Sequence, residues 1–139
     1  YAADWNSNLL ISRLMDGTEI LKIQVEIKNS SLAGHVARNC RPLNVRDVYD
    51  ASELARHHSD LAFDRTWDEK VGYRTRHVLC VPVVHDGEVQ GVIQAINREQ
   101  VHGTHDPFTV EDQICLAEVA ERLAPDLARI RLSTAWSTS

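Results

Sequence analysis

Apolar residues in the first third of the chain recur with the two-residue period of β-strands. Residues 9–14 and 20–27 are rich in Leu, Ile and Val, and a turn-like segment at residues 15–18 separates them. Within residues 22–28 apolar side chains alternate with charged or amide side chains, which predicts a strand with one buried and one solvent-exposed face. Residues 1–3 precede another turn-like segment, and we expect them to end an earlier strand whose start lies ahead of this sequence.

The next segments carry helix start signals. The Asn-Ser-Ser of residues 29–31 can cap a helix over residues 32–38, and Pro42 ends it, which predicts an extended piece at residues 43–45.

A second helix is predicted to start at Asp50 and to run toward His58, because Glu53 completes the pattern of a capping box. A third short helix is expected at residues 65–70. We expect the segment that holds both helices, residues 47–73, to cover one face of the sheet.

The strongest local signal is a β-hairpin in the middle of the chain. Two runs of β-forming residues, 77–84 and 89–97, flank a short connection in which Asp86-Gly87 suits the positive φ angles of a type I′ turn. So short a connection can join only antiparallel neighbours. The hairpin is therefore predicted to be the centre of an antiparallel sheet.

A long helix is predicted on the other face of the sheet, after a loop at residues 99–107. Thr109 and Asp112 form its cap signal, and we expect Pro125 to kink it, because a proline inside a helix costs roughly 3 kcal/mol. Its apolar residues predict one packing seam, made of Leu116, Ala120, Leu123, Leu127 and Ile130. Residues 133–139 lack periodicity and are expected to be a tail or linker, which leaves residues 1–132 as one α+β domain.

Composition and charge narrow the class of protein. The chain of 139 residues is 43% hydrophobic and 25% charged, as expected of one globular domain. A net charge of -5 provides no basic field for nucleic acid, and no apolar run approaches the ~20 residues of a membrane span. Three cysteines without a C-x-x-C pair indicate neither a disulfide framework nor a zinc site, and they favour a cytoplasmic setting.

Several strings, in this order, resemble the GAF domain family. They are SSLAGHVA at residues 30–37, RPLNVRD at 41–47, DEKVGYRTR at 68–76, LCVPV at 79–83 and GVIQAINR at 91–98. Together they span nearly the whole chain, and their spacing is most similar to the GAF subtype of cyclic nucleotide phosphodiesterases. Further matches around Tyr49 and Phe63 also resemble bacterial GAF domains attached to secretion-type ATPases and other signalling outputs.

The phosphodiesterase subtype carries an Asn-Lys-Phe-Asp-Glu motif. The resemblance maps it onto Asn97, Arg98, Phe108, Asp112 and Gln113, so that Arg replaces Lys and Gln replaces Glu. Val71 also stands where the subtype has Thr. The family's Lys/Asp bridge would here be an Arg98 to Asp112 pair, which a guanidinium can form at least as well as an ammonium group.

The resemblance also implies a ligand cavity between the sheet and the helices of the middle third. We expect the residues around it to include Asp47, Phe63, Trp67, Tyr73, Arg74, Thr75 and Cys80. Aromatic rings beside arginines suit a planar ring with an anionic group, so the expected partner is a small ligand, with a cyclic nucleotide as one candidate, and no other cofactor is expected. In the alternative, the aromatic residues fill the cavity and the domain is an interaction or dimerisation module.

Neither a catalytic nor a metal site is predicted. The tightest histidine groups, His57-His58 and His102 with His105, lack the three or four supported ligands that zinc requires. GAF-type reductases of free methionine sulfoxide carry thiols near a Gly-x-Cys-Gly string, where this chain has Leu-Ala-Gly at residues 32–34, so that activity is the weaker alternative. We expect a non-enzymatic sensory domain of a bacterial signalling or secretion-type protein, which passes a conformational change to an attached output domain.

Association is expected through the last helix. GAF domains normally begin with a helix that packs beside the C-terminal one, and we expect that helix and the start of the first strand to be missing from this sequence. A seam of about two heptads buries little area against the cost of association. We therefore expect a homodimer of the parent protein and weak association of this chain alone.

Overall fold

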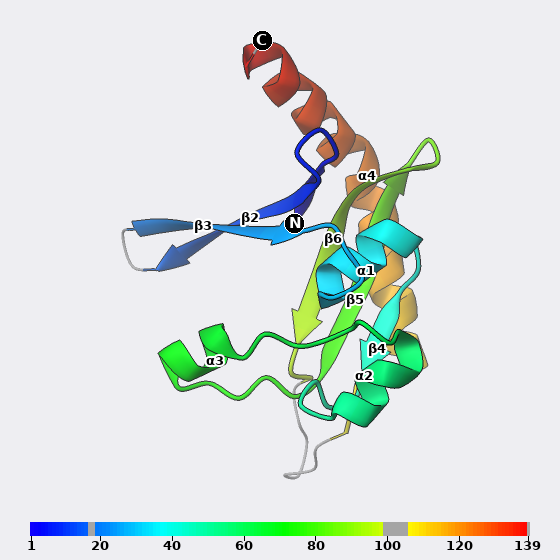
Figure 1. Cartoon of the computed structure of the whole chain (residues 1–139). Helices are drawn as coiled ribbons and strands as arrows, with labels where there is room; N and C mark the ends of the chain where they lie inside the picture. Colours follow the sequence, from blue (N-terminus) through cyan, green and yellow to red (C-terminus); the bar gives the residue numbers. More distant parts are fainter. Residues whose placement is uncertain (17–18, 99–105, 139) are drawn as a thin grey trace.

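The computed structural model describes residues 1–16, 19–98 and 106–138, with side chains described for residues 1–11, 26–98 and 106–130. Six antiparallel strands in these residues form one sheet in the order β3-β2-β1-β6-β5-β4, with helices on both faces (Figure 1). The strands are β1 (Ala2–Asp4), β2 (Leu9–Asp16), β3 (Glu19–Glu26), β4 (Leu43–Val45), β5 (Val78–His85) and β6 (Glu88–Ile96). The helices are α1 (Leu32–Asn39), α2 (Ala51–His57), α3 (Thr66–Val71) and α4 (Val110–Thr138). The predicted α+β class is confirmed.

The central hairpin of β5 and β6 has the turn that the sequence predicts. Asp86 and Gly87 have φ angles of 51° and 77°, so both turn residues adopt the left-handed conformation of a type I′ turn. The two strands pair in antiparallel register, with an irregularity between Val83 and Val84. The hairpin prediction is therefore confirmed.

Strand β1 joins this hairpin to the one that β2 and β3 form. Ala2 pairs with Ile11 of β2 on one side and with Gly91 of β6 on the other. The Tyr1 carbonyl oxygen lies so close to Gly91 that a Cβ at this position would overlap it. The strand expected at residues 1–3 is present as β1, and the absence of a side chain at Gly91 lets β1 pair with β6.

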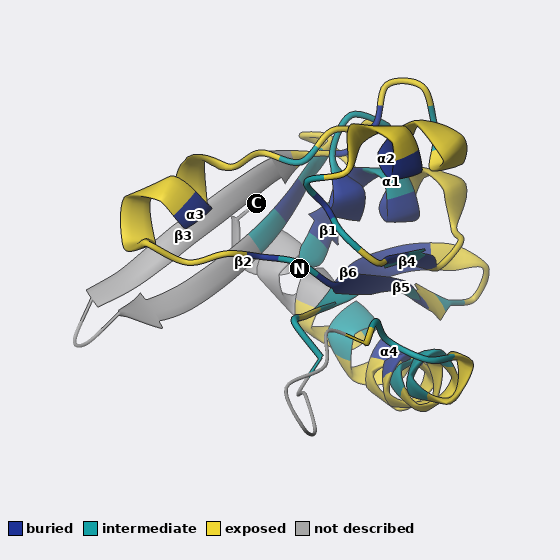
Figure 2. Ribbon diagram, turned by 90° about the horizontal axis from the view of Figure 1, so that it is seen from below, coloured by how far each residue is buried: buried dark blue, intermediate teal, exposed yellow. Residues whose placement is uncertain are grey.

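Residues of β5 alternate between two cores. Val78 and Cys80 pack with α1 and α2, whereas Leu79, Val81 and Val83 face α4. Figure 2 shows α4 on one side of the sheet and α1 and α2 on the other. The two-faced arrangement expected for the hairpin is confirmed, and α1 shares the second face with the 47–73 segment.

Helix α1 starts where its sequence directs and then packs closely on the sheet. The Ser31 hydroxyl accepts a hydrogen bond from Gly34 N at 3.1 Å and caps the helix, as predicted. A Cβ on Gly34 would lie 2.5 Å from the Glu26 carbonyl oxygen and 2.7 Å from that of Lys28. The first turn of α1 can lie against the end of β3 only because residue 34 lacks a side chain.

The start of α2 corrects one prediction. Asp50 caps the helix by accepting hydrogen bonds from Ser52 N at 3.0 Å and Glu53 N at 3.2 Å. Glu53 does not complete a capping box, because its buried carboxylate accepts from Arg46 N at 2.7 Å and Asp47 N at 3.0 Å. A contact between segments has replaced the local one, and it holds the turn that follows β4.

The apolar seam of α4 also differs from the prediction. The residues that pack on the sheet are Leu116, Ala120, Ala124 and Leu127. Leu123 and Ile130, which the spacing assigned to the same seam, are 45% and 56% exposed. The buried stripe is centred on the two alanines because their small side chains allow close approach to β5, and the neighbouring stripe then faces solvent.

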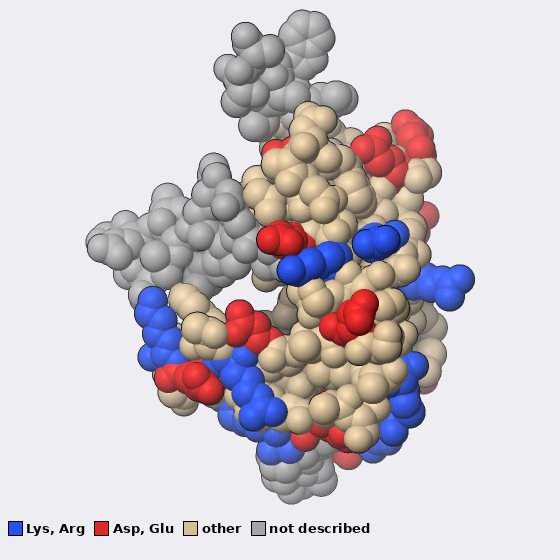
Figure 3. Space-filling view, viewed as in Figure 1, with Lys and Arg blue, Asp and Glu red and all other residues tan. Residues whose placement is uncertain are grey.

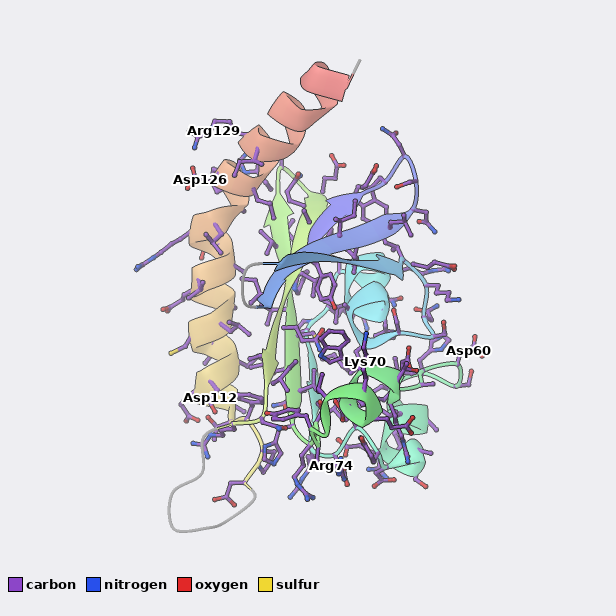
Figure 4. All side chains as sticks on the ribbon, turned by 90° about the vertical axis from the view of Figure 1, so that its left-hand side faces the viewer. Asp60, Lys70, Arg74, Asp112, Asp126 and Arg129 are labelled. Atoms are coloured by element: carbon purple, nitrogen blue, oxygen red, sulfur yellow. The ribbon has the colours of Figure 1, made fainter. Side chains whose placement is uncertain are left out.

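Pro125 bends α4 without ending it. Figure 4 shows the helix changing direction near the labelled Asp126, in agreement with the predicted kink. Pro125 and Glu121 are exposed, so water can reach the Glu121 carbonyl that has no N–H partner at residue 125.

The end of α4 is longer than predicted. Residues 133–138, which are expected to be a tail or linker, are helical, because a helix already under way extends at little cost. Residues 99–105 of the expected loop, with His102 and His105, lie outside the described residues.

Candidate functional site

A small pocket opens on the face of the sheet opposite α4, where α2 meets the segment that leads to α3. Its volume is about 170 Å³. The apolar lining residues are Val48, Ala51, Leu54, Leu61, Ala62 and Phe63, and the polar ones are Tyr49 and Arg65. Because Val48, Leu54 and Leu61 belong to the buried core, the pocket is a recess in that core with a polar rim.

Tyr49 connects the pocket to a charged network. Its ring packs against Phe63 with the centroids 5.7 Å apart. The guanidinium carbons of Arg74 and Arg65 lie 3.6 Å and 4.0 Å from the centre of the same ring, within cation–π distance. Acidic and basic side chains alternate over this part of the surface in Figure 3, around α3 and the adjoining segments.

Asp68 is the buried residue of α3, and it attaches this helix to the domain. Its carboxylate accepts hydrogen bonds from the Tyr49 hydroxyl at 2.8 Å, from Thr75 N at 2.8 Å and from the Thr75 hydroxyl at 2.7 Å. Burial alone would raise the pKa of Asp68, but the bonds from Thr75 and Tyr49 outweigh it and hold the pKa below its ordinary value. The other residues of α3 are exposed, so this carboxylate is its main anchor.

The two arginines on Tyr49 differ in their ionic partners. Arg74 Nη2 lies 2.9 Å from Asp47 Oδ1, and the same carboxylate accepts from Tyr49 N at 3.0 Å. Burial acts to raise the pKa of Asp47, and the bonds from Tyr49 and Arg74 bring it below its ordinary value. Arg65 pairs with no carboxylate in the part of the chain that the structure describes. Of the two cations on the Tyr49 ring, Arg74 is therefore neutralised by a carboxylate and Arg65 is not.

Asn97 fastens the strand end to the segment beside the pocket. Its Oδ1 accepts from Arg76 N at 2.6 Å and His77 N at 3.2 Å, and its Nδ2 donates to the Tyr73 hydroxyl at 2.8 Å and the Arg74 carbonyl at 2.9 Å. The backbone of Asn97 has a φ of 54°, a left-handed conformation that Asn tolerates better than most residues. The Asn of the family motif therefore joins the end of β6 to residues 73–77 through four side-chain hydrogen bonds.

The next motif residues link β6 to α4. Arg98 Nε lies 3.0 Å from Asp112 Oδ2, so the predicted pair is present. Thr109 N donates to the same carboxylate at 2.8 Å, and Asp112 N donates to the Thr109 hydroxyl at 3.1 Å, which forms the predicted cap. The Thr109 bonds and then the Arg98 charge hold the pKa of Asp112 below its ordinary value. Phe108 packs beside this cap against the core under α4.

Four of the seven predicted ligand-binding residues lie in the pocket lining or in the polar network around Tyr49. Phe63 lines the pocket, and Asp47, Arg74 and Thr75 belong to the network around Tyr49. The sequence-based prediction did not select Tyr49, Arg65 or Asp68, although Tyr49 and Asp68 lie in strings that carry the GAF resemblance.

The other three predicted residues lie elsewhere. Trp67 and Tyr73 are 41% and 50% exposed, and Lys70 stacks over the Trp67 ring 5.7 Å from its centre. Cys80 does not line the pocket and is buried in the core cluster on the same face of the sheet.

The cysteines provide no reactive pair. Burial raises the pKa of the Cys80 thiol to about 12, so this group stays protonated at neutral pH. Cys40 and Cys115 are exposed, but one ends α1 and the other lies on α4, on opposite faces of the sheet. Within the residues that the structure describes, no group of three His, Cys, Asp or Glu side chains could hold a metal ion.

A second, more open groove of about 250 Å³ lies between α4 and the central hairpin. Its lining is mostly apolar and consists of Leu79, Ala95, Phe108, Asp112, Cys115, Leu116 and Val119.

The described helices include none with the length and apolar character that spanning a bilayer requires.

A family model of the GAF domain matches residues 8–127. The chain therefore belongs to the GAF domain family, whose members are typically regulatory or sensory modules. A curated relative, the dual 3',5'-cyclic-AMP and -GMP phosphodiesterase 11 of Drosophila melanogaster, is 34% identical over 98 residues, which cover 64% of this chain and 6% of that protein.

Solved structures share the fold at low sequence identity. The GAF domain of a phosphoenolpyruvate-protein phosphotransferase from Coxiella burnetii has a TM-score of 0.58 and 20% identity, over 81% of this chain and 58% of that one. A free methionine-R-sulfoxide reductase from Neisseria meningitidis, solved with its substrate, has a TM-score of 0.63 and 19% identity, over 96% of this chain and 67% of that one. The GAF domain of a two-component sensor histidine kinase from Bacillus halodurans has a TM-score of 0.56 and 15% identity, over 88% and 70%. The fold is thus shared by regulatory domains and an enzyme.

Proposed function

We propose that this GAF domain is a non-enzymatic sensor that takes a small ligand into the pocket lined by Phe63 and Tyr49. Ligand binding would change the position of α4, and α4 would pass that change to an attached output domain. We take residues 1–132 as the sensory domain and the helical residues 133–138 as the start of the connection. A regulatory role is favoured over reductase chemistry because the thiols lie apart and Cys80 is inert. Free cysteines also fit a reducing, cytoplasmic compartment.

The observation that carries the proposal is a continuous set of polar contacts between the pocket rim and the start of α4. Tyr49 bonds to Asp68, and Asp68 bonds to Thr75 in the segment that Asn97 clips to the end of β6. The adjoining Arg98 then pairs with Asp112 in the first turn of α4. Figure 4 places Arg74 below α3 and Asp112 on the other side of the sheet, so these contacts join its two faces. A ligand that shifts α3 would alter them from one end.

The phosphodiesterase relative makes cyclic nucleotides the first ligands to test. Thermal unfolding of the whole chain would be followed with cyclic AMP, cyclic GMP and a set of small metabolites. A ligand of the native state at a hundred times its Kd stabilises by about 2.7 kcal/mol, which is readily measured as a rise in Tm. The control is Phe63→Ala, which removes the pocket wall and should abolish the rise.

Transmission is tested by hydrogen exchange with and without the ligand that raises Tm. We expect altered protection both at α3 and in the first turn of α4, and loss of the α4 response in Asn97→Ala. If no compound raises Tm in a pocket-dependent way, the sensor proposal is wrong.

A second candidate is an association module that works through α4. Val119, Leu123 and Ile130 are 47%, 45% and 56% exposed, and Val119 also borders the groove beside the hairpin. We expect a homodimer to use this stripe. Because Leu123 is half exposed, Leu123→Glu should change the free energy of unfolding by less than about 0.5 kcal/mol. Sedimentation should then show weaker association; an unchanged association constant contradicts the candidate.

A further inference from the structure

The pocket is too small, as it stands, for most nucleotide-sized ligands. Its volume of about 170 Å³ falls below the roughly 300–1,000 Å³ of typical small-molecule sites. The lining favours an apolar body, since six of its residues are Val, Ala, Leu or Phe. A short aliphatic or single aromatic group fits this description.

One charged group on the rim is available to such a ligand. The Arg65 guanidinium lines the pocket and is held over Tyr49, with its central carbon 4.0 Å from the ring centre. On the same ring Arg74 is engaged by Asp47 at 2.9 Å, whereas Arg65 has no carboxylate partner among the described side chains. The planar fork of donors on an arginine matches a carboxylate in two-point contact.

We propose that this pocket binds a small monocarboxylate with an apolar body, whose carboxylate pairs with Arg65 while its body lies against Phe63 and Leu61. This inference rests on the proposed sensory function and specifies the ligand class of that site. Stacking on Tyr49 restrains the guanidinium before binding, which lowers the cost of ordering it. The carboxylate of the ligand would give Arg65 an ionic partner, as Asp47 already does for Arg74.

The test compares acids with their neutral amides, so that shape is kept and charge is removed. Isovalerate and isovaleramide form one pair of probes, and phenylacetate and phenylacetamide form the other. Binding to the whole chain is followed by two-dimensional NMR, which reports both affinity and the residues whose signals move. Arg65→Gln removes the rim charge, Arg65→Lys keeps the charge without the fork, and Arg129→Gln on α4 is the matched control.

We expect at least one acid to shift the signals of Phe63 and Leu61 and to bind about tenfold or more tightly than its amide. Arg65→Gln should weaken the acid to the affinity of the amide and leave the amide unchanged, Arg65→Lys should fall between, and Arg129→Gln should match the wild type. Equal binding of acid and amide, or full acid affinity in Arg65→Gln, overturns the carboxylate assignment and leaves the sensor proposal intact. Binding of cyclic AMP or cyclic GMP in this pocket, with no binding of the acids, also overturns the carboxylate assignment and leaves the sensor proposal intact. Failure of every acid, amide and nucleotide to bind the pocket overturns both.

Discussion

Replacing Asp68 with Ala tests whether one carboxylate holds α3 on the domain. The substitution leaves the buried Thr75 N–H and hydroxyl without their acceptor, while the Tyr49 hydroxyl can turn to water. A buried donor left unpaired costs about 1–3 kcal/mol, so we expect a loss of about 2–4 kcal/mol in the free energy of unfolding. Asp68→Asn should lose less, about 1 kcal/mol, because an amide can accept from Thr75 N and donate to the Thr75 hydroxyl.

The effect of Asp68 should also depend on pH. Its pKa in the folded protein lies below its ordinary value, which is about 3.9 for Asp. A carboxyl group with a depressed folded pKa stabilises fully above its unfolded pKa and loses that contribution as the pH falls through the folded pKa. The difference between wild type and Asp68→Asn should therefore be constant near neutral pH and shrink below about pH 4.

Two assays separate global from local effects. Urea unfolding gives the free energy, and limited trypsin digestion with mass spectrometry reports cleavage after Lys70, which lies on α3 (Figure 4). We expect Asp68→Ala to speed that cleavage about tenfold or more, because the helix opens more often. The matched control is Asp60→Ala in an exposed loop, which should change stability by less than about 0.5 kcal/mol. If Asp68→Ala resembles Asp60→Ala in both assays, the anchoring role is refuted.

Three further outcomes are expected. Arg98→Ala and Asp112→Ala should be non-additive in a double-mutant cycle of urea unfolding, since the two side chains touch at 3.0 Å; strictly additive losses would mean that they do not interact in solution. Gly34→Ala should lower the free energy of unfolding by about 1–3 kcal/mol despite the better helix propensity of Ala, because backbone carbonyls crowd the new methyl group. A neutral or stabilising result in the same assay would contradict that packing. Iodoacetamide at pH 8 should modify the two exposed cysteines of the native protein and spare Cys80, whose pKa is about 12. Mass spectrometry of the labelled chain identifies the modified cysteines. Early labelling of Cys80 would show that its strand opens.

Structure that depends on neighbours in the sequence was predictable. The Asp86-Gly87 turn, the Ser31 cap and the reciprocal cap of Thr109 and Asp112 all formed as the local residues indicated. Each involves groups within three or four residues, so its geometry is set by backbone angles and one short side chain. The hairpin and the order of helices followed from these signals.

Where a side chain had a choice of partners, the local signal failed. Glu53 carries the pattern of a capping box, yet it accepts bonds from Arg46 and Asp47 in a neighbouring turn. On α4 the spacing alone could not say which of two adjoining stripes would face the sheet, and the small Ala120 and Ala124 took that place while Leu123 remained exposed. The close approach of α4 to the sheet, which small side chains allow, decided which of the two stripes is buried.

The sequence by itself determined the elements of this protein, their antiparallel pairing and the residues of the family motif, since periodicity, turn residues and caps act over short stretches of chain. Only the tertiary structure decided the candidate site. Tyr49 precedes α2, Arg65 and Asp68 belong to the start of α3, and Arg74 follows that helix. Folding brings the two guanidinium groups over one ring and gives a carboxylate partner to Arg74 alone. Burial and charge pairing depend on the distances between segments, and those distances are set by how the whole chain packs on the sheet.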